Sequence, residues 1–315
     1  MKLKPILTHY GRQFGTLIGL VLLCVVLWAL TPYFLTPSNL LNILQQVSIN
    51  AIVAVGMTFV IISAGIDLSV GSMVAFSGVV LASALQAGLP VPLAIAAGLG
   101  AGVLCGLVNG LLITYGRLPP FISTLGMMSV ARGAALVYTN GRPISGFDQG
   151  FRALATGEVL FIPVPVIFMA GIYVAGHFLL TRTKLGRYTY AIGGNEEATR
   201  LSGVNVRFHK TVVYALSGLT SGIAAIVLTA RLNSAQPIAG LMYELDAIAA
   251  TVIGGTSLMG GEGTLVGTLI GALIMGVLRN GLNLLGVSSF LQQIFIGSVI
   301  IAAVLVDAML KSQRK

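Results

Sequence analysis

Long apolar stretches, separated by short polar or glycine- and proline-rich segments, dominate the chain from one end to the other. A helix that crosses a bilayer needs about 20 predominantly apolar residues. We predict spans near residues 15–34, 44–63, 70–87, 91–114, 121–139, 162–181, 211–230, 245–258, 265–285 and 290–309. The expected fold class is therefore all-α: a polytopic membrane bundle of about ten transmembrane helices in a single domain, 1–315.

The eighth of these spans differs from the others. Barely enough residues separate Asp246 from Glu262 to cross a bilayer, and the segment IGGTSLMGG between them is rich in glycine. We predict a short or partly broken helix there. A break of this kind is tolerated at membrane depth only where protein or a water-filled cavity surrounds the freed backbone groups.

Charged residues are rare, and they avoid the predicted spans. No Asp, Glu, Lys or Arg lies between Arg12 and Asp67, or between Asp67 and Arg117. A charge at the centre of a membrane helix costs about 2.5–3.5 kcal/mol on insertion scales. Charged residues make up 9% of the chain, whereas a soluble domain carries roughly 25%. The solvent of this chain is therefore mostly lipid.

The basic residues predict the orientation of the bundle. Thirteen of the eighteen fall on one side of the predicted topology: Lys2, Lys4, Arg12, Arg117, Arg182, Lys184, Arg187, Arg200, Arg207, Lys210, Lys311, Arg314 and Lys315. The positive-inside rule places that side in the cytoplasm. We therefore expect both termini inside, with 1–14 as a cytoplasmic tail before an uncleaved first span, 140–161 as an external loop and 182–210 as a cytoplasmic loop. The net charge of +9 then reflects topology, and no basic–aromatic patch indicates nucleic-acid binding.

Glycines recur every fourth residue along several spans. They are Gly98, Gly102, Gly106 and Gly110 in the fourth span, Gly218 and Gly222 in the seventh, and Gly267 and Gly271 in the ninth. In lipid, small residues at this spacing let two helix backbones approach closely. The pattern predicts close helix packing within one subunit rather than a specific dimer motif.

A weak internal similarity relates the second and third spans to the eighth and ninth. A shift of 196 positions aligns Ala51, Ile52 and Ala54 with Ala247, Ile248 and Ala250, and Gly65, Val70 and Gly71 with Gly261, Val266 and Gly267. Transporters often contain structural repeats with the substrate path between them. Duplication and a shared bias toward small apolar residues both explain these identities.

The sequence contains no signature of catalysis. It has no GxxxxGK[ST] phosphate-binding loop, and its three histidines are scattered over a tail, a span and a loop. Cys24 and Cys105 lie inside apolar spans, where they predict neither a disulfide nor a metal site. We expect no cofactor and no metal, and a membrane protein without catalytic groups most simply transports something.

Polar residues within the spans are mostly uncharged. Among them we select as candidates for the substrate path Asn50, Thr58, Asn109, Asn280 and Asn283. Neutral amides and hydroxyls suit a neutral polyol, although such side chains also bridge neighbouring helices. Arg132 and Arg279 are the ionisable candidates, and we expect no acidic residue at mid-span to pair with them, which disfavours a proton- or sodium-coupled carrier.

Three acidic residues lie near the ends of spans. Asp67 is in a glycine-rich junction, where we expect it to cap the following helix rather than to contact substrate. Glu244 and Asp246 are expected at the outer end of the eighth span. There they could cap that helix, line the outer mouth of a path or receive a basic residue of a partner, and the sequence leaves these roles open.

The loop 182–210 is the most polar part of the chain and reads RTKLGRYTYAIGGNEEATRLSGVNVRFHK. The stretch EEATRLSG predicts a short amphipathic helix with Glu197 near its start and Gly203 at its C-terminal stop. By composition alone, this segment is a solvated cytoplasmic loop.

Glu197, Ala198 and Thr199, followed by Gly203, resemble the EAA-x3-Gly coupling motif of ABC importer permeases, with threonine in place of the second alanine. Other segments resemble ribose-type sugar permeases: NILQQVSINAIVAVGMT, ISAGIDLSVGS, LGRYTYAIGGNEEATRLSGVN, YELDAIAATVIGGTSLMGG and RNGLNLLGVSSF. The resemblance runs from about Pro37 to Asp307.

This resemblance implies a type II ABC importer permease in the bacterial inner membrane, acting as a homodimer and without enzymatic activity of its own. A separate cytoplasmic ATPase would bind the coupling segment, for which the candidates are Gly193, Gly194, Asn195, Glu196, Glu197, Ala198, Thr199, Arg200 and Gly203. A periplasmic sugar-binding protein would dock on the outer face, with candidates Glu244, Asp246 and Arg142. Ribose is the expected cargo; a branched-chain amino-acid permease and a self-sufficient facilitator or channel are the alternatives.

Overall fold

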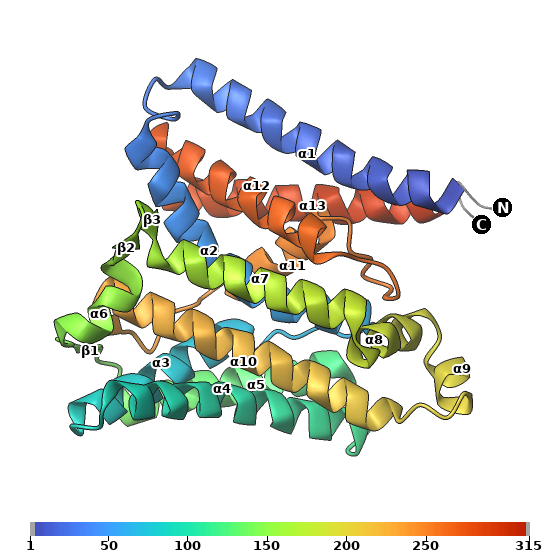
Figure 1. Ribbon diagram of the computed structural model, residues 1–315, viewed down its shortest axis with the longest axis horizontal. Coiled ribbons are helices and arrows are strands. Elements are labelled where there is room, and N and C mark those ends of the chain that lie inside the picture. The colour runs from blue at the N-terminus through green and yellow to red at the C-terminus, as the bar shows by residue number, and fades with distance from the viewer. Residues whose placement is uncertain (1–3, 313–315) are drawn as a thin grey trace.

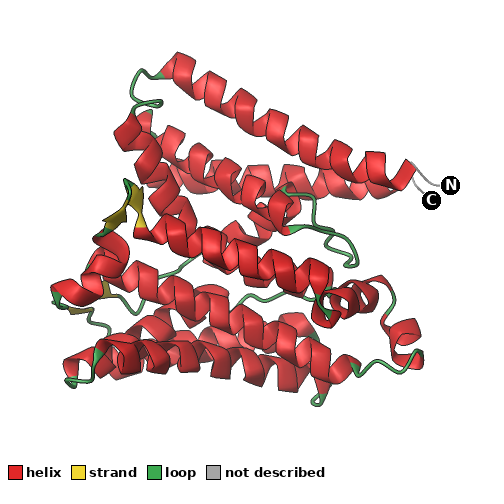
Figure 2. Cartoon of the chain, in the orientation of Figure 1, coloured by secondary structure: helices red, strands yellow, loops and turns green. Residues whose placement is uncertain are grey.

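The computed structural model describes residues 4–312 and is almost entirely helical (Figures 1 and 2). Lys2, Arg314 and Lys315, which enter the orientation argument, lie outside the described residues. The elements are α1 (Lys4–Leu30), α2 (Pro37–Ile62), α3 (Val70–Gln86), α4 (Val91–Thr114), α5 (Pro120–Thr139), β1 (Ile144–Ser145), α6 (Gln149–Thr156), β2 (Glu158–Val159), β3 (Ile162–Pro163), α7 (Val164–Arg182), α8 (Lys184–Gly194), α9 (Glu196–Leu201), α10 (Val206–Leu232), β4 (Ser234–Ala235), α11 (Tyr243–Ile253), α12 (Leu265–Leu284) and α13 (Ser289–Ser312).

Six helices in the described part of the chain are long and apolar enough to cross a membrane: α2, α4, α5, α7, α10 and α12. Three shorter apolar helical stretches accompany them, in α1, in α3 and at the start of α13. Each predicted span coincides with one of these helices except the eighth, which coincides with α11. The chain is therefore a polytopic membrane protein.

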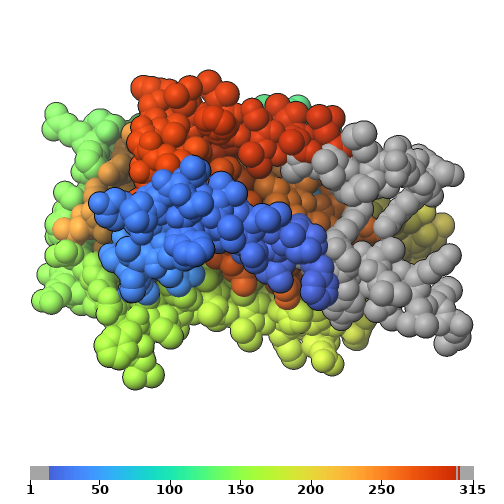
Figure 3. Space-filling model, turned by 90° about the horizontal axis from the view of Figure 1, so that it is seen from above, coloured from blue at the N-terminus to red at the C-terminus, as the bar shows by residue number. Residues whose placement is uncertain are grey.

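The centre of the bundle is formed by α2 and α10, which are the most enclosed of the long helices. The glycine pattern packs α4 against α10, as predicted. A Cβ added at Gly102 or Gly106 would overlap the carbonyl oxygen of Gly218 or Tyr214, respectively, so glycine permits this backbone approach. On the other side of the core, α12 packs against α1, where Gly281 faces Leu27. Figure 3 shows the blue surface of the first helices beside the red surface of α12 and α13.

The two ends of the bundle have different structures. The short strands and α6 gather at one end, where β1 pairs antiparallel with β4 and β2 with β3. Helices α8 and α9 project at the opposite end, where α1 begins and α13 ends (Figure 1). The start of α1, the end of α13 and the 182–210 loop therefore lie at the same end of the molecule.

The predicted break in the eighth span is confirmed. Helix α11 has 11 residues and ends at Ile253, after which residues 254–264 lead without helical structure to α12. Positive backbone φ angles at Gly255, Gly260, Gly261 and Gly263 direct this loop, and glycine adopts them without a Cβ penalty. Residues 63–69 form a similar non-helical junction between α2 and α3. The helix–break–helix arrangement thus occurs twice, at the positions that the shift of 196 aligns.

Candidate functional site

Asn195 organises the projecting segment between α8 and α9. It follows the last residue of α8, and its side-chain oxygen accepts a hydrogen bond from the Ala198 backbone N–H at 2.9 Å, which caps α9. Gly203 follows α9 with φ +83°, a conformation that glycine adopts readily at a helix C-terminus. The predicted short helix is confirmed at residues 196–201, with a side-chain cap at its start and a glycine after its end.

The charged side chains of α9 lie on the surface. Glu197 and Arg200 are paired and each is 64% exposed, and the Arg200 hydrogen bonds hold the pKa of Glu197 below its ordinary value. Glu196 accepts a bond from Lys210 Nζ at 2.9 Å. The exposed Glu197–Arg200 pair contributes little to stability, whereas Lys210 is buried and ties Glu196 to α10. The segment therefore presents a charged polar face to its surroundings.

The inner side of the same segment contacts both helix breaks. The Tyr190 hydroxyl donates to the Gly263 carbonyl oxygen at 2.7 Å, and burial raises the Tyr190 pKa to about 12. Gly193 lies so close to the end of α2 that an added Cβ would overlap the Ile62 carbonyl oxygen. That oxygen already accepts the Gly261 N–H at 2.9 Å. The end of α8 thus meets the break after α2 and the break after α11 at one point.

A second polar feature is a cavity of about 380 Å³ between α11, α12 and α13. Its polar lining residues are Asp246, Arg279, Asn283, Ser289, Gln292 and Gln293. A smaller cavity of about 30 Å³ adjoins it, and Asp246 and Arg279 line both. The volume of the larger cavity is within the ~300–1,000 Å³ range of small-molecule sites.

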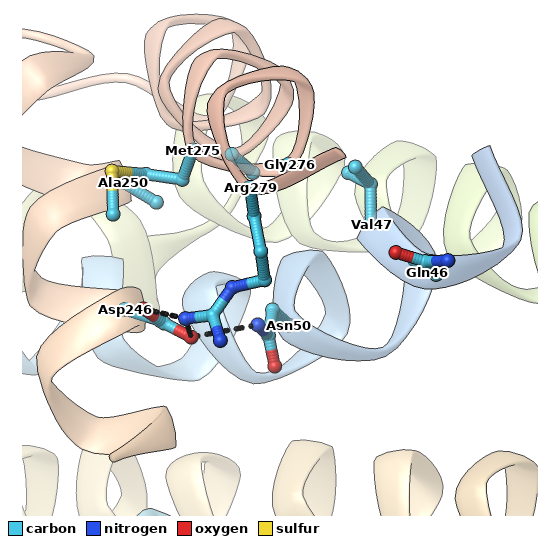
Figure 4. A pocket seen from close by; sticks show the side chains of 9 residues that line it. Gln46, Val47, Asn50, Asp246, Ala250, Met275, Gly276 and Arg279 are labelled. Atoms are coloured by element: carbon cyan, nitrogen blue, oxygen red, sulfur yellow. Dashed lines mark hydrogen bonds and ion pairs between the residues drawn. The ribbon is translucent and has the colours of Figure 1, made fainter. Parts of the chain in front are cut away.

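Asp246 and Arg279 form an ion pair at the junction of the two cavities (Figure 4). Arg279 Nη2 lies 2.9 and 2.8 Å from the two carboxylate oxygens of Asp246. Asn50 of α2 donates to the same carboxylate at 3.0 Å. The sequence-based expectation that Arg279 has no acidic partner was wrong, because α11 begins inside the bundle and carries Asp246 to the depth of Arg279.

The five predicted path residues fall into two groups. Asn50 and Asn283 line the cavities. The other three bridge helices: Thr58 bonds Thr268 at 2.8 Å, Asn109 donates to Ser69 at 2.9 Å, and Asn280 exchanges two bonds with Asn39. A role in the path remains a prediction for all five, and the geometry favours Asn50 and Asn283.

The three predicted docking residues are also separated. Arg142 is exposed beside β1, at the end of the bundle that carries the strands. Glu244 lies in the first turn of α11 and is partly buried. Asp246 is only 4% exposed, and its carboxylate is turned toward Arg279 inside the bundle. Docking remains a prediction for Arg142 and Glu244, while the burial of Asp246 favours a role at the cavity.

Arg132, the other intramembrane arginine, supports the loop that leads into α11. Its Nη1 donates to the carbonyl oxygens of Pro237 at 2.8 Å and Ala239 at 2.6 Å. These two carbonyl oxygens lie between β4 and α11, outside any helix, and accept hydrogen bonds from the arginine instead of from a helix N–H. We read this arginine as structural.

Asp67 is fully buried in the first break, where it bonds the residue before α3 rather than capping the helix itself. Its Oδ1 accepts the Ser69 N–H at 2.9 Å and the Ser69 hydroxyl at 2.6 Å. Its Oδ2 accepts the Ser217 hydroxyl of α10 at 2.8 Å. The carboxylate therefore joins the break to the central helix.

Sequence reasoning missed Gln292 and dismissed Arg279. A usable signal was present, because Arg279 and Asn283 are four residues apart and so share one face of α12. Gln292 is 6% exposed and donates to Asn283 Oδ1 at 2.7 Å. Among the described residues, no group of three or more His, Cys, Asp or Glu side chains could hold a metal ion.

Comparison with known proteins places this geometry in a transport context. The family described as branched-chain amino acid transport system, permease component, matches residues 39–304. The ribose import permease protein RbsC of Escherichia coli K12 is 53% identical over 95% of this chain and 98% of its own length. RbsC of Bacillus subtilis 168 is 52% identical over 94% of this chain and 92% of its own length. The D-allose transport system permease protein AlsC of E. coli K12 is 41% identical over 96% of this chain and 93% of its own length. No solved structure matches the chain.

Proposed function

This chain belongs to the family of branched-chain amino acid transport system permease components, and we propose that it forms the membrane path of an ABC importer for a monosaccharide, ribose first among them. The observation that carries the proposal is identity above 50% to ribose import permeases over nearly the whole of both chains. A permease of this kind is a transport subunit of the inner membrane rather than an enzyme. The uncharged amides along its cavities support a neutral cargo.

Coupling to ATP is proposed to occur through residues 193–203. A separate cytoplasmic ATPase subunit would contact the exposed charges Glu196, Glu197 and Arg200 on α9. ATP-driven movement of that partner would bias the bundle between inward- and outward-open states, which requires different contacts in each state. The contacts of Tyr190 and Gly193 with the two breaks support this assignment, since they connect the surface segment to the membrane helices.

The topology proposed for this function has ten passes. Helix α11 and its break together account for the eighth pass, and both termini and the 182–210 loop face the cytoplasm. The 140–161 segment, with Arg142, would face the periplasm and receive a sugar-binding protein. The shared end of α1, α8, α9 and α13 supports this arrangement, and two copies of the chain would form the complete permease.

Transport of a branched-chain amino acid is the second candidate, favoured by the family description and by the presence of one charge of each sign at Asp246 and Arg279. Those two charges neutralise one another, however, and a zwitterion would have to separate them. Uptake assays with a shared set of partners would decide between sugar and amino acid.

Reconstitution in proteoliposomes tests the proposed function. The chain together with its ATPase and binding protein should take up ribose only when ATP is present. Ribose uptake by the chain alone, unaffected by ATP, would instead identify a facilitator or channel. Leucine uptake without ribose uptake would identify the amino-acid permease.

The variant Glu197→Arg tests the coupling segment. It places a positive charge beside Arg200 on the exposed face while leaving the capping bonds of Asn195 in place. We expect uptake and sugar-stimulated ATP hydrolysis to be abolished, with unchanged yield and size-exclusion profile of the purified chain. Normal stimulated hydrolysis in this variant would contradict the assignment of residues 193–203.

A further inference from the structure

We propose that the Asp246–Arg279 pair, with Asn283 and Gln292, is a transient binding station for the hydroxyl groups of a neutral monosaccharide on its way through the bundle. The inference rests on the proposed function and assigns it a specific site and ligand chemistry. It starts from an intramembrane ion pair, and ionisable groups inside a membrane bundle are costly and commonly mark substrate or ion pathways.

The two members of the pair are unequally exposed. The side chain of Arg279 is 41% exposed, whereas that of Asp246 is 5% exposed. Both side chains line the larger cavity, and the guanidinium is the more accessible of the two. Asn50 from α2 holds the carboxylate (Figure 4). Among the described residues the guanidinium bonds only through Nη2, so that the N–H groups on Nη1 and Nε are free to donate.

The amides beside the pair complete a mixed donor and acceptor set. Gln292 Nε2 donates to Asn283 Oδ1 at 2.7 Å and to the Val287 carbonyl oxygen at 2.9 Å. That leaves Asn283 Nδ2 as a donor and Gln292 Oε1 as an acceptor without a hydrogen bond in the described structure. Sugar hydroxyls both donate and accept, so they match this set.

The charge of the station favours a neutral ligand. Asp246 and Arg279 together carry no net charge, and neither Asn283 nor Gln292 is ionisable. An amino acid would have to compete with Asp246 for the guanidinium and with Arg279 for the carboxylate. Separating the pair would leave the buried Asp246 carboxylate without its counter-charge, which is costly, whereas a polyol can bind to the outer N–H groups of an intact pair.

The station is also suited to passage rather than storage. The polar lining of the cavity is confined to a few side chains among apolar ones, so a sugar would exchange a few hydrogen bonds for those it makes with water. Conduction requires binding strong enough for entry and weak enough for exit. The site thus lowers the cost of moving a hydrated polyol into an apolar bundle.

The test compares the variant Asp246→Asn/Arg279→Gln with the wild-type chain in the complete reconstituted importer. The double variant is isosteric at Asp246, shortens the side chain at Arg279 and leaves no charge unpaired. We expect roughly tenfold slower ribose uptake per ATP hydrolysed, as for the loss of one charge-assisted contact, with binding-protein-stimulated hydrolysis retained. Ser298→Ala is the matched control, because Ser298 lies on the same helix as Gln292 but is exposed, lines neither cavity and bonds the Ile294 carbonyl oxygen of its own helix, so it should leave uptake unchanged.

A second readout separates binding from mere structural support. The ratio of ribose to 2-deoxyribose uptake depends on the binding protein and on the permease, and the binding protein is the same in every assay. A change of that ratio in the double variant, or in Arg279→Lys, which keeps the charge but loses the planar donors, supports the station. Wild-type uptake per ATP and an unchanged ratio in both variants would overturn it, while failure of the wild-type importer to transport ribose would instead refute the proposed function.

Discussion

The two helix breaks occupy equivalent places in the internal repeat but are held in different ways. The first, residues 63–69, is fixed by buried side chains: Asp67 binds Ser69 and Ser217, and Asn109 of α4 binds Ser69. The second, residues 254–264, contains four glycines with positive φ. Its contacts with the first break and with α8 include the bond from Gly261 N–H to the Ile62 carbonyl oxygen and the bond from the Tyr190 hydroxyl to the Gly263 carbonyl oxygen.

This difference indicates which break is rigid and which can move. A buried carboxylate with several hydrogen-bond donors is costly to disturb, because each unsatisfied group loses its partner without gaining water. Glycine is conformationally permissive, and four glycines in the second break already adopt positive φ, so more backbone conformations are open to this loop. We therefore interpret the first break as a fixed support and the second as the part that responds to α8. Substitutions at each of the two breaks test this difference.

The largest effect is expected at the first break. Asp67→Ala leaves the Ser69 and Ser217 hydroxyls and one backbone N–H without their acceptor, at a cost of about 3 kcal/mol or more. We expect a lower thermal-unfolding midpoint of the purified chain in detergent. Asp148→Ala is the control, since Asp148 also precedes a helix but makes no side-chain cap bond. A variant of normal stability with selectively impaired uptake would mean that Asp67 acts in transport and that the first break is not simply a support.

An intermediate effect is expected where α8 meets the breaks. Gly193→Ala inserts a methyl group against the Ile62 carbonyl oxygen and against the Gly261 backbone nitrogen of the second break, and overpacking of this kind costs about 1–3 kcal/mol. Because the second break can yield, we expect the loss to appear as slower ribose uptake per ATP hydrolysed rather than as unfolding. Gly194→Ala provides the control, since nothing lies within 4 Å of a Cβ at that position. If Gly193→Ala and Gly194→Ala reduced uptake equally, the close contact of Gly193 with Ile62 would have no part in coupling.

The sequence predicted the positions of the helices because lipid imposes a strong rule on charge and length. It could not predict which helices are central, since lipid and protein interior are equally apolar: α2 is largely enclosed and α4 is largely exposed. The cap of α9 by Asn195 depends on neighbours three residues apart and was accessible from the sequence. The Asp246–Arg279 pair was not, because it joins residues 33 positions apart across a break whose path only the fold defines.

The smallest effect is expected from Tyr190→Phe, which removes a single hydrogen bond to the Gly263 carbonyl oxygen and leaves the ring packing intact. A hydrogen bond of this kind contributes about 1 kcal/mol, or roughly a fivefold change in an equilibrium. If α8 moves the second break through this bond, ribose uptake per ATP should fall by about that factor, with the unfolding midpoint almost unchanged. Tyr188→Phe is the control, because the ring of Tyr188 packs edge-on against His209 and its hydroxyl makes no hydrogen bond among the described residues. A fall in stability with normal uptake would show that the second break is held as rigidly as the first, and the contrast between the two would be lost.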